Sequence, residues 1–207
     1  MNTGYRFAFR SFDEEIEARV RSDRVPIEGL AEDLLKLLVL RGISDSDLNR
    51  LAALIAALRN VDFDRVYLGY FRHPLRLALN FCRDLPDPPR YEAIALALCH
   101  NVRELAVPGL PAICREFLSD PEIVSSLDSL ETDRSRERDS EYLNTFYDAI
   151  AAAPLEALRL KGFDKLDNLL IFGFKDFDRY HTDVITDFLV PRLASIAPRL
   201  VPRIIPE

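Results

Sequence analysis

The chain has 207 residues, of which 48% are hydrophobic and 29% are charged, with a formal net charge of −7 at pH 7. This length and composition are typical of one soluble globular domain that can bury a real core, so we expect a single domain over residues 1–207. The negative charge argues against a broad basic face for nucleic acid, and an anionic substrate would need a locally basic pocket.

Cysteine usage and hydropathy indicate the cellular setting. The three cysteines are too few and too scattered for a disulfide framework, and Cys99 and Cys114 lie in apolar stretches, as in a reduced protein. The N-terminal segment has no apolar signal core, and no later run is long enough to span a membrane. We therefore expect a cytoplasmic protein without a membrane partner.

Two helices are predicted near the N-terminus. Leucines at helical spacing in residues 30–38 follow Pro26 and predict a helix that Gly42 ends. Ser44 and Asp47 form a capping-box pattern, which predicts the start of a second helix.

The next two predicted helices carry the two histidines that matter most below. Pro74 suits the first turn of a helix, so His73 would open a helix that runs to the loop at residues 84–89. Pro89 can begin the following helix, with His100 late in it.

The rest of the chain also shows helical spacing. A mixed-charge loop is expected at residues 131–140, and Pro191 would kink the last helix. No alternating β pattern is present, so the predicted fold class is all-α, a helical bundle. The remaining helices are predicted over residues 111–118, 121–130, 141–152, 155–171 and 177–197.

Two of the three histidines belong to a set of residues that could hold one metal ion. His73, His100 and the adjacent Asn101 supply two imidazoles and an amide oxygen, and Asp164 on a third helix supplies a carboxylate. Such a mixed nitrogen and oxygen set suits a divalent transition metal. Glu104 follows His100 by one helical turn, where a carboxylate could orient or deprotonate an attacking water.

Three sequence blocks resemble a known family. Residues 70–78 read YFRHPLRLA, close to a Y-x-x-H-P-x-x-V-A block. Residues 98–105 read LCHNVREL against an L-x-H-D-x-x-E-D type, and residues 160–169 read LKGFDKLDNL against a V-K-x-A-D-K-L-x-N-L type. In order and spacing they resemble the HD superfamily of metal-dependent phosphohydrolases, especially the (p)ppGpp hydrolase (RelA/SpoT-like) branch. The resemblance covers about residues 48–185.

This resemblance implies an HD-domain-like bundle, preceded by extra N-terminal helices, with a divalent metal cofactor. Manganese is the first expectation, and iron, cobalt, nickel, magnesium and zinc are the alternatives. Glu104 would be the catalytic residue. The implied metal ligands are His73, His100, Asn101 and Asp164. The residues implied to contact the substrate are Tyr70, Arg72, Lys161, Lys165 and Asn168.

The chain departs from the family pattern at two positions. Asn101 stands where the family has its name-giving aspartate, so Asp164 alone would bring a formal negative charge to the metal. A two-metal centre is therefore disfavoured. Leu105 also replaces the acid of the family's E-D pair.

The expected function is that of a metal-dependent phosphohydrolase acting on a phosphorylated nucleotide, most like a guanosine 3′,5′-bis(diphosphate) 3′-pyrophosphohydrolase. The alternative is a catalytically impaired HD-like protein that binds a nucleotide or a protein partner, and a third interpretation is a helical interaction domain without a site. The expected partners are a small-molecule nucleotide and, in a homodimer, a second copy of the chain.

Plainer interpretations of the same residues stay open at this point. Asp164 and Asp167 could be solvated charges on a helix face, and Glu104 could pair with Arg103 or Lys161. Asn101 could be a hydrogen-bonding group beside the metal instead of a ligand. The third histidine, at position 181, has no motif around it and is expected to be structural or to lie near the pocket mouth.

Overall fold

The computed structural model describes residues 25–63, 69–85, 88–102, 105, 107–172 and 185–196. Every regular element within these ranges is a helix, which confirms the predicted all-α bundle. None of the described helices is long and apolar enough to cross a membrane. The α-helices are α2 (Ile27–Leu40), α3 (Asp45–Arg59), α4 (Arg72–Asp84), α5 (Tyr91–Cys99), α6 (Leu110–Phe117), α7 (Pro121–Leu130), α8 (Ser140–Ala152), α9 (Leu155–Phe172) and α11 (Val190–Ile196).

Side-chain caps begin three of these helices where the sequence places short polar residues. The Ser44 hydroxyl accepts from the backbone N–H of Asp47 (3.1 Å) and donates to the Asp47 carboxylate (2.9 Å), which confirms the predicted start of α3. Asp120 and Asp139 accept backbone N–H groups in the same way at α7 and α8. Each cap satisfies donors that a helix start leaves without a partner.

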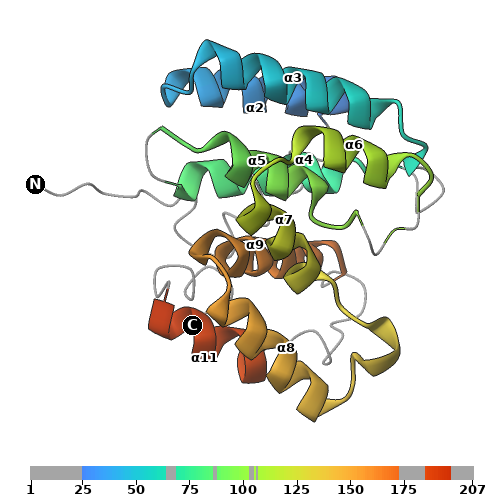
Figure 1. Ribbon diagram of the computed structural model, residues 1–207, viewed down its shortest axis with the longest axis vertical. Coiled ribbons are helices and arrows are strands. Elements are labelled where there is room, and N and C mark those ends of the chain that lie inside the picture. Colours follow the sequence, from blue (N-terminus) through green and yellow to red (C-terminus); the bar gives the residue numbers. More distant parts are fainter. Residues whose placement is uncertain are drawn as a thin grey trace, which may run out of the picture.

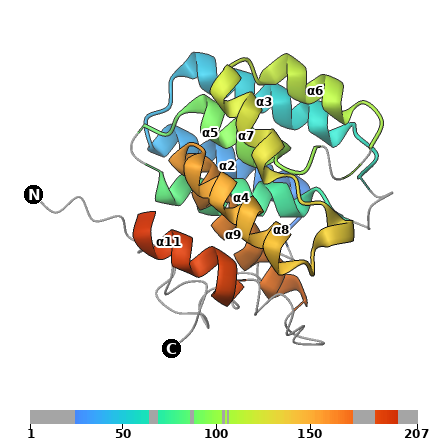
Figure 2. The ribbon, with the colours of Figure 1, turned by 60° about the horizontal axis from the view of Figure 1, so that its bottom comes forward.

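The helices are stacked in layers (Figure 1). α2 and α3 lie at one end of the molecule, α4 and α5 lie beneath them, and α9 and α7 separate this pair from α8 and α11. In Figure 2, where the bottom of the molecule comes forward, these layers overlap and α8, α9 and α11 lie in front. α4 contacts α2, α5 and α9, so it lies at the centre of the bundle.

Apolar packing fixes the relation of α4, α5 and α9. α5 is buried along most of its length, and its small residues Ala93, Ala95 and Ala97 are each at most 1% exposed. The rings of Phe81 on α4 and Phe163 on α9 meet edge to face, with centroids 6.1 Å apart. Because these faces are close-packed, the three helices form a rigid frame for the side chains between them.

The last predicted helix, at residues 177–197, begins with a π-helical turn where its described residues start. Residues 177–184 of the predicted range 177–197 lie outside the described residues. The chain then forms a π-helix at Ile185–Leu189, which continues into α11. Pro191 is the second residue of α11, and it has no N–H to donate to the preceding turn. The wider π-helical turn lies directly before it.

Candidate metal centre

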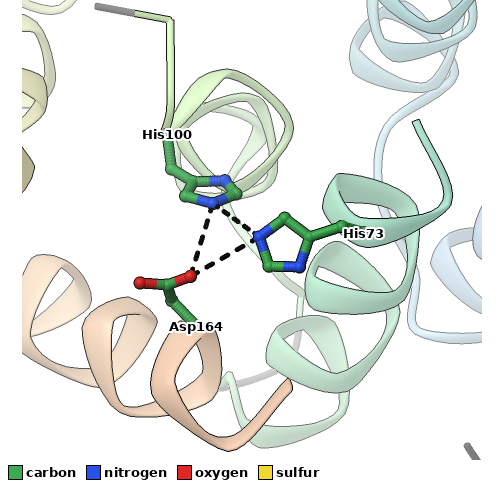
Figure 3. Close-up of side chains that lie close together, drawn as sticks. All are labelled: His73, His100 and Asp164. Carbon is green, nitrogen blue, oxygen red and sulfur yellow. Dashed lines mark hydrogen bonds and ion pairs between the residues drawn. The ribbon is translucent and has the colours of Figure 1, made fainter. Parts of the chain in front are cut away.

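Three buried side chains converge from the three central helices. His73 lies in the first turn of α4, and Asp164 lies in the middle of α9. His100 is the residue directly after the last residue of α5, one position beyond the predicted helical placement. The three residues are 2%, 3% and 6% exposed for His73, Asp164 and His100, and their side chains point toward one another (Figure 3).

The distances among the three side chains fit a single ion. The Nε2 atoms of His73 and His100 are 3.1 Å apart, and Oδ1 of Asp164 lies 3.5 Å from the first and 3.8 Å from the second. Ligand atoms at about 2.0–2.1 Å from a tetrahedral metal are about 3.3 Å from each other. The three atoms therefore have the spacing of one ligand set.

The hydrogen bond at Nδ1 of His73 indicates the tautomer of this ring. Nδ1 lies 2.6 Å from Oδ2 of Asp167, which is itself buried. An ionised carboxylate can only accept, so Nδ1 carries the proton and donates it. In the neutral ring, the lone pair is then on Nε2, which faces His100 and Asp164.

His100 has the same tautomer for a different reason. Its Nδ1 lies 2.8 Å from the carbonyl oxygen of Ala97, one turn earlier in the chain. A carbonyl also only accepts, so Nδ1 donates and the lone pair is on Nε2. Two lone pairs and a carboxylate oxygen thus meet, an arrangement that requires a cation between them, either a proton or a metal ion.

The charges around the two rings favour a proton on His73 when no metal is bound. Burial lowers the pKa of His73, but hydrogen bonding to Asp164 and Asp167 outweighs it and raises this pKa to about 9. Burial and the positive charge of His73 lower the pKa of His100 to about 4. In the metal-free protein His73 therefore donates from Nε2 and His100 stays neutral.

Asp164 is held by two residues that the sequence assigned to substrate binding. Lys161 places Nζ 3.3 Å from Oδ2 of Asp164, and Asn168 donates to Oδ1 at 3.1 Å. Burial raises the pKa of Asp164, but Lys161 and His73 hold it well below its usual range. Lys161 is only 3% exposed and also donates to the carbonyl oxygen of Leu130. Its described contacts thus orient the carboxylate, and its substrate contact stays a prediction.

Asp167 and Arg76 form a part of the site that sequence reasoning missed. Asp164, Asp167 and Arg76 are all buried, so the interpretation of the two aspartates as solvated charges is wrong. Arg76 donates from Nε to Oδ1 and from Nη2 to Oδ2 of Asp167, each at 3.0 Å. A signal was present, because Arg76 follows His73 by three residues and Asp167 follows Asp164 by three, which places each pair on one helix face.

Tyr70, two residues before the start of α4, lies beside both Asn101 and His73. The amide nitrogen of Asn101 donates to the Tyr70 hydroxyl (2.7 Å), and the Tyr70 ring lies 5.8 Å from the His73 ring. Asn101 is thus oriented by Tyr70. Its part as a ligand stays a prediction.

A small hollow lies beside Tyr70 and Asn101. Its walls come from Phe63, Tyr70 and the residues at and after the end of α5. Its lining residues are mostly apolar and include His100 and Asn101. The hollow therefore lies against two of the candidate ligands, His100 and Asn101. The lining residues are Phe63, Tyr70, Pro74, Leu98, Cys99, His100, Asn101, Val102, Leu105 and Leu110.

The remaining candidate residues lie around this centre or outside the described ranges. Arg72 donates to the backbone carbonyl of Val25, which ties the start of α4 to the segment just before α2. Lys165 is half-buried, and its charge helps to lower the pKa of Asp164. Glu104 and His181 lie outside the described residues.

Comparison of the chain with protein-family models, with curated proteins and with solved structures finds no match. Functional inference therefore rests on the residues and their geometry.

Proposed function

We propose that this protein is a metal-dependent phosphohydrolase of the HD type that acts on a phosphorylated nucleotide, closest to a guanosine alarmone. The observation that carries the proposal is the meeting of two imidazole lone pairs with the Asp164 carboxylate at ligand spacing. The order of the three sequence blocks supports the choice of family.

The donor set indicates the kind of ion. Two neutral imidazoles and one carboxylate suit a divalent transition metal, with manganese the first candidate and iron, cobalt, nickel or zinc close alternatives. When bound, such an ion supplies a Lewis acid for a phosphoryl oxygen and lowers the pKa of a water ligand. One formal negative charge among the ligands supports one ion and argues against two.

The protein's own residues prepare this site. The contacts of Asp167 and the Ala97 carbonyl point both Nε2 lone pairs inward, and Lys161 and Asn168 hold Asp164 in place. The burial of the three candidate ligands excludes bulk water and strengthens every charge interaction there. The hollow beside His100 has room for about one water, so a phosphate group would need its lining side chains to move before it could reach the centre. Glu104 would be the proton acceptor, and Tyr70, Arg72 and Lys165 would lie near the nucleotide.

The direct test is hydrolysis by metal-loaded protein. Protein stripped with a chelator and reloaded with Mn²⁺ should release pyrophosphate from a guanosine nucleotide that carries a 3′-diphosphate. Glu104→Gln keeps the shape but removes the proton acceptor, so it should lower kcat roughly 10²–10⁴-fold and leave nucleotide binding unchanged. Equal turnover in wild type and Glu104→Gln would contradict the catalytic role of Glu104.

A second candidate function is nucleotide or partner binding without turnover. The hydrogen bond from Asn101 to Tyr70 and the ion pair of Lys161 with Asp164 favour it, because position 101 carries a neutral amide and a lysine already offsets the charge of Asp164. Binding of the same nucleotide by calorimetry, with no product across Mn²⁺, Co²⁺ and Zn²⁺, would select this function. Protein that neither binds nor cleaves the nucleotide would reject both.

A further inference from the structure

We propose that Asp167, clamped by Arg76, is a positioning residue that keeps the His73 proton on Nδ1 and so presents Nε2 to the ion. The metal half of this inference rests on the proposed function. The proton placement concerns the protein alone and can be tested without turnover.

The contacts leave this carboxylate little freedom. Oδ2 of Asp167 accepts from His73 Nδ1 and from Arg76 Nη2, while Oδ1 accepts from Arg76 Nε. All three residues are at most 5% exposed. The bidentate contact with the Arg76 guanidinium prevents the carboxylate from rotating away from His73, because rotation would break both hydrogen bonds from Arg76 at once.

A purely structural role would use the same contacts. Arg76 lies on α4 and Asp167 on α9, so their ion pair also joins two central helices. The two roles differ in what an amide at position 167 would do. A structural pair would lose stability and leave the His73 tautomer unchanged, whereas a positioning carboxylate would lose control of the tautomer.

An amide in Asp167→Asn no longer fixes the His73 proton on Nδ1. An amide has one acceptor oxygen, yet Arg76 directs donors at both positions that the carboxylate oxygens occupy. With its oxygen toward Arg76 Nε, the amide places its NH₂ beside His73 and donates to Nδ1. With its oxygen toward His73 it keeps the same number of hydrogen bonds, and in either orientation its NH₂ faces one Arg76 donor, so the amide does not select one tautomer. In the first orientation Nδ1 cannot carry a proton, and the ring proton is on Nε2, the position that the metal needs.

The experiment is ¹⁵N NMR of the histidine rings, without metal and with added Zn²⁺, at one pH for all variants. In wild type, His73 Nδ1 should carry a proton in both states, and Zn²⁺ should shift Nε2. Asp167→Asn should lower the fraction of His73 that carries a proton on Nδ1 and bind Zn²⁺ about 10–100-fold more weakly. Asp164→Asn is the matched control, because it removes the charge of a ligand but should keep the Nδ1 proton.

A second pair of variants separates positioning from stability. Arg76→Gln keeps Asp167, so Nδ1 should stay protonated even though the ion pair is lost. Adding Arg76→Gln to Asp167→Asn gives the amide nitrogen a carbonyl to bind and frees its oxygen to accept from Nδ1. The double variant should carry the Nδ1 proton and bind Zn²⁺ with most of the wild-type affinity. This result can be measured even if Asp167→Asn alone fails to fold.

Two outcomes would overturn the inference. One is an Asp167→Asn protein that keeps the Nδ1 proton and binds Zn²⁺ as tightly as Arg76→Gln. The other is a double variant that regains neither property. A wild-type protein with a protonated Nδ1 but no response to Zn²⁺ would leave the positioning role standing and reject the metal site.

Discussion

The two histidines of the centre reach the same tautomer with very different neighbours. His100 is held by the carbonyl oxygen of Ala97 in the last turn of α5, three residues earlier, whereas His73 is held by a carboxylate 94 residues away on α9. The first arrangement follows from local helix geometry, and the second needs α4 and α9 to pack correctly. The tautomer of His100 is therefore set by local structure alone, whereas the tautomer of His73 is set only when the whole bundle has folded.

The same difference governs charge. The carbonyl beside His100 is neutral, and this ring has its pKa lowered to about 4. His73 lies between two ionised carboxylates, and its pKa is raised to about 9. A local backbone contact thus gives a neutral ligand, whereas the tertiary contact gives a ligand that holds a proton until a metal displaces it.

The largest expected effect is on the stability of the His73 side. Arg76→Leu leaves Asp167 buried with its strongest partner removed, which should lower the free energy of unfolding by about 3–5 kcal/mol. Arg90→Leu is the control, because Arg90 is an exposed partner of Asp120 and its loss should cost about 1 kcal/mol or less. Urea unfolding of both variants measures the difference. Equal losses would mean that the α4–α9 ion pair does not hold the tertiary half of the site.

The next largest expected effect is on metal affinity, and here the two histidines should behave alike. His73→Leu and His100→Leu each remove one of the three converging atoms, so each should weaken Zn²⁺ binding by about 100-fold or more, beyond the effect of an outer-shell change. Competition with a chromophoric chelator measures both affinities. If one variant bound Zn²⁺ like wild type, that histidine would not be a ligand.

The proton on His73 should make metal binding depend on pH. Because the pKa of His73 is raised to about 9, the ring is charged at pH 7 and must lose a proton to ligate. Apparent affinity should therefore rise about tenfold per pH unit from pH 7 toward 9 and level off above. Calorimetry in buffers of different ionisation enthalpy should show close to one proton released per ion at pH 7. A flat profile over this range would contradict the raised pKa.

The stability of the metal-free protein should change in the opposite direction. A histidine whose pKa is raised on folding contributes its full stabilisation below its unfolded pKa of about 6.5 and loses it as the pH rises through 9. Thermal melting at pH 6 and pH 9 without metal should show the lower Tm at pH 9, and added metal should remove much of this difference.

The smallest expected effect concerns the departure at Asn101. Asn101→Asp adds a carboxylate next to His100, and the Tyr70 hydroxyl can donate to it where it now accepts. One more negative charge should tighten Mn²⁺ binding by on the order of tenfold. Calorimetry that shows equal or weaker Mn²⁺ binding would place position 101 outside the metal's ligand shell.

The sequence by itself determined the local elements and the choice of candidate ligands. The capping pair Ser44 and Asp47, the proline at the start of α4 and the helical spacing of leucines act over one or two turns, so they can be recognised without the fold. The motif letters around His73, His100 and Asp164 singled out three residues that the structure brings together. The helix bounds of α7 and α8 also follow from local signals.

Only the tertiary structure decided what surrounds these ligands. The contacts of Asp167 with His73 and Arg76 span 94 and 91 residues, and no periodicity along the chain specifies which faces of α4 and α9 meet. The burial of Asp164 and Lys161 likewise depends on neighbouring helices. Helix formation is governed by contacts three or four residues apart, whereas the protonation state of a buried histidine is governed by the charges that packing places beside it.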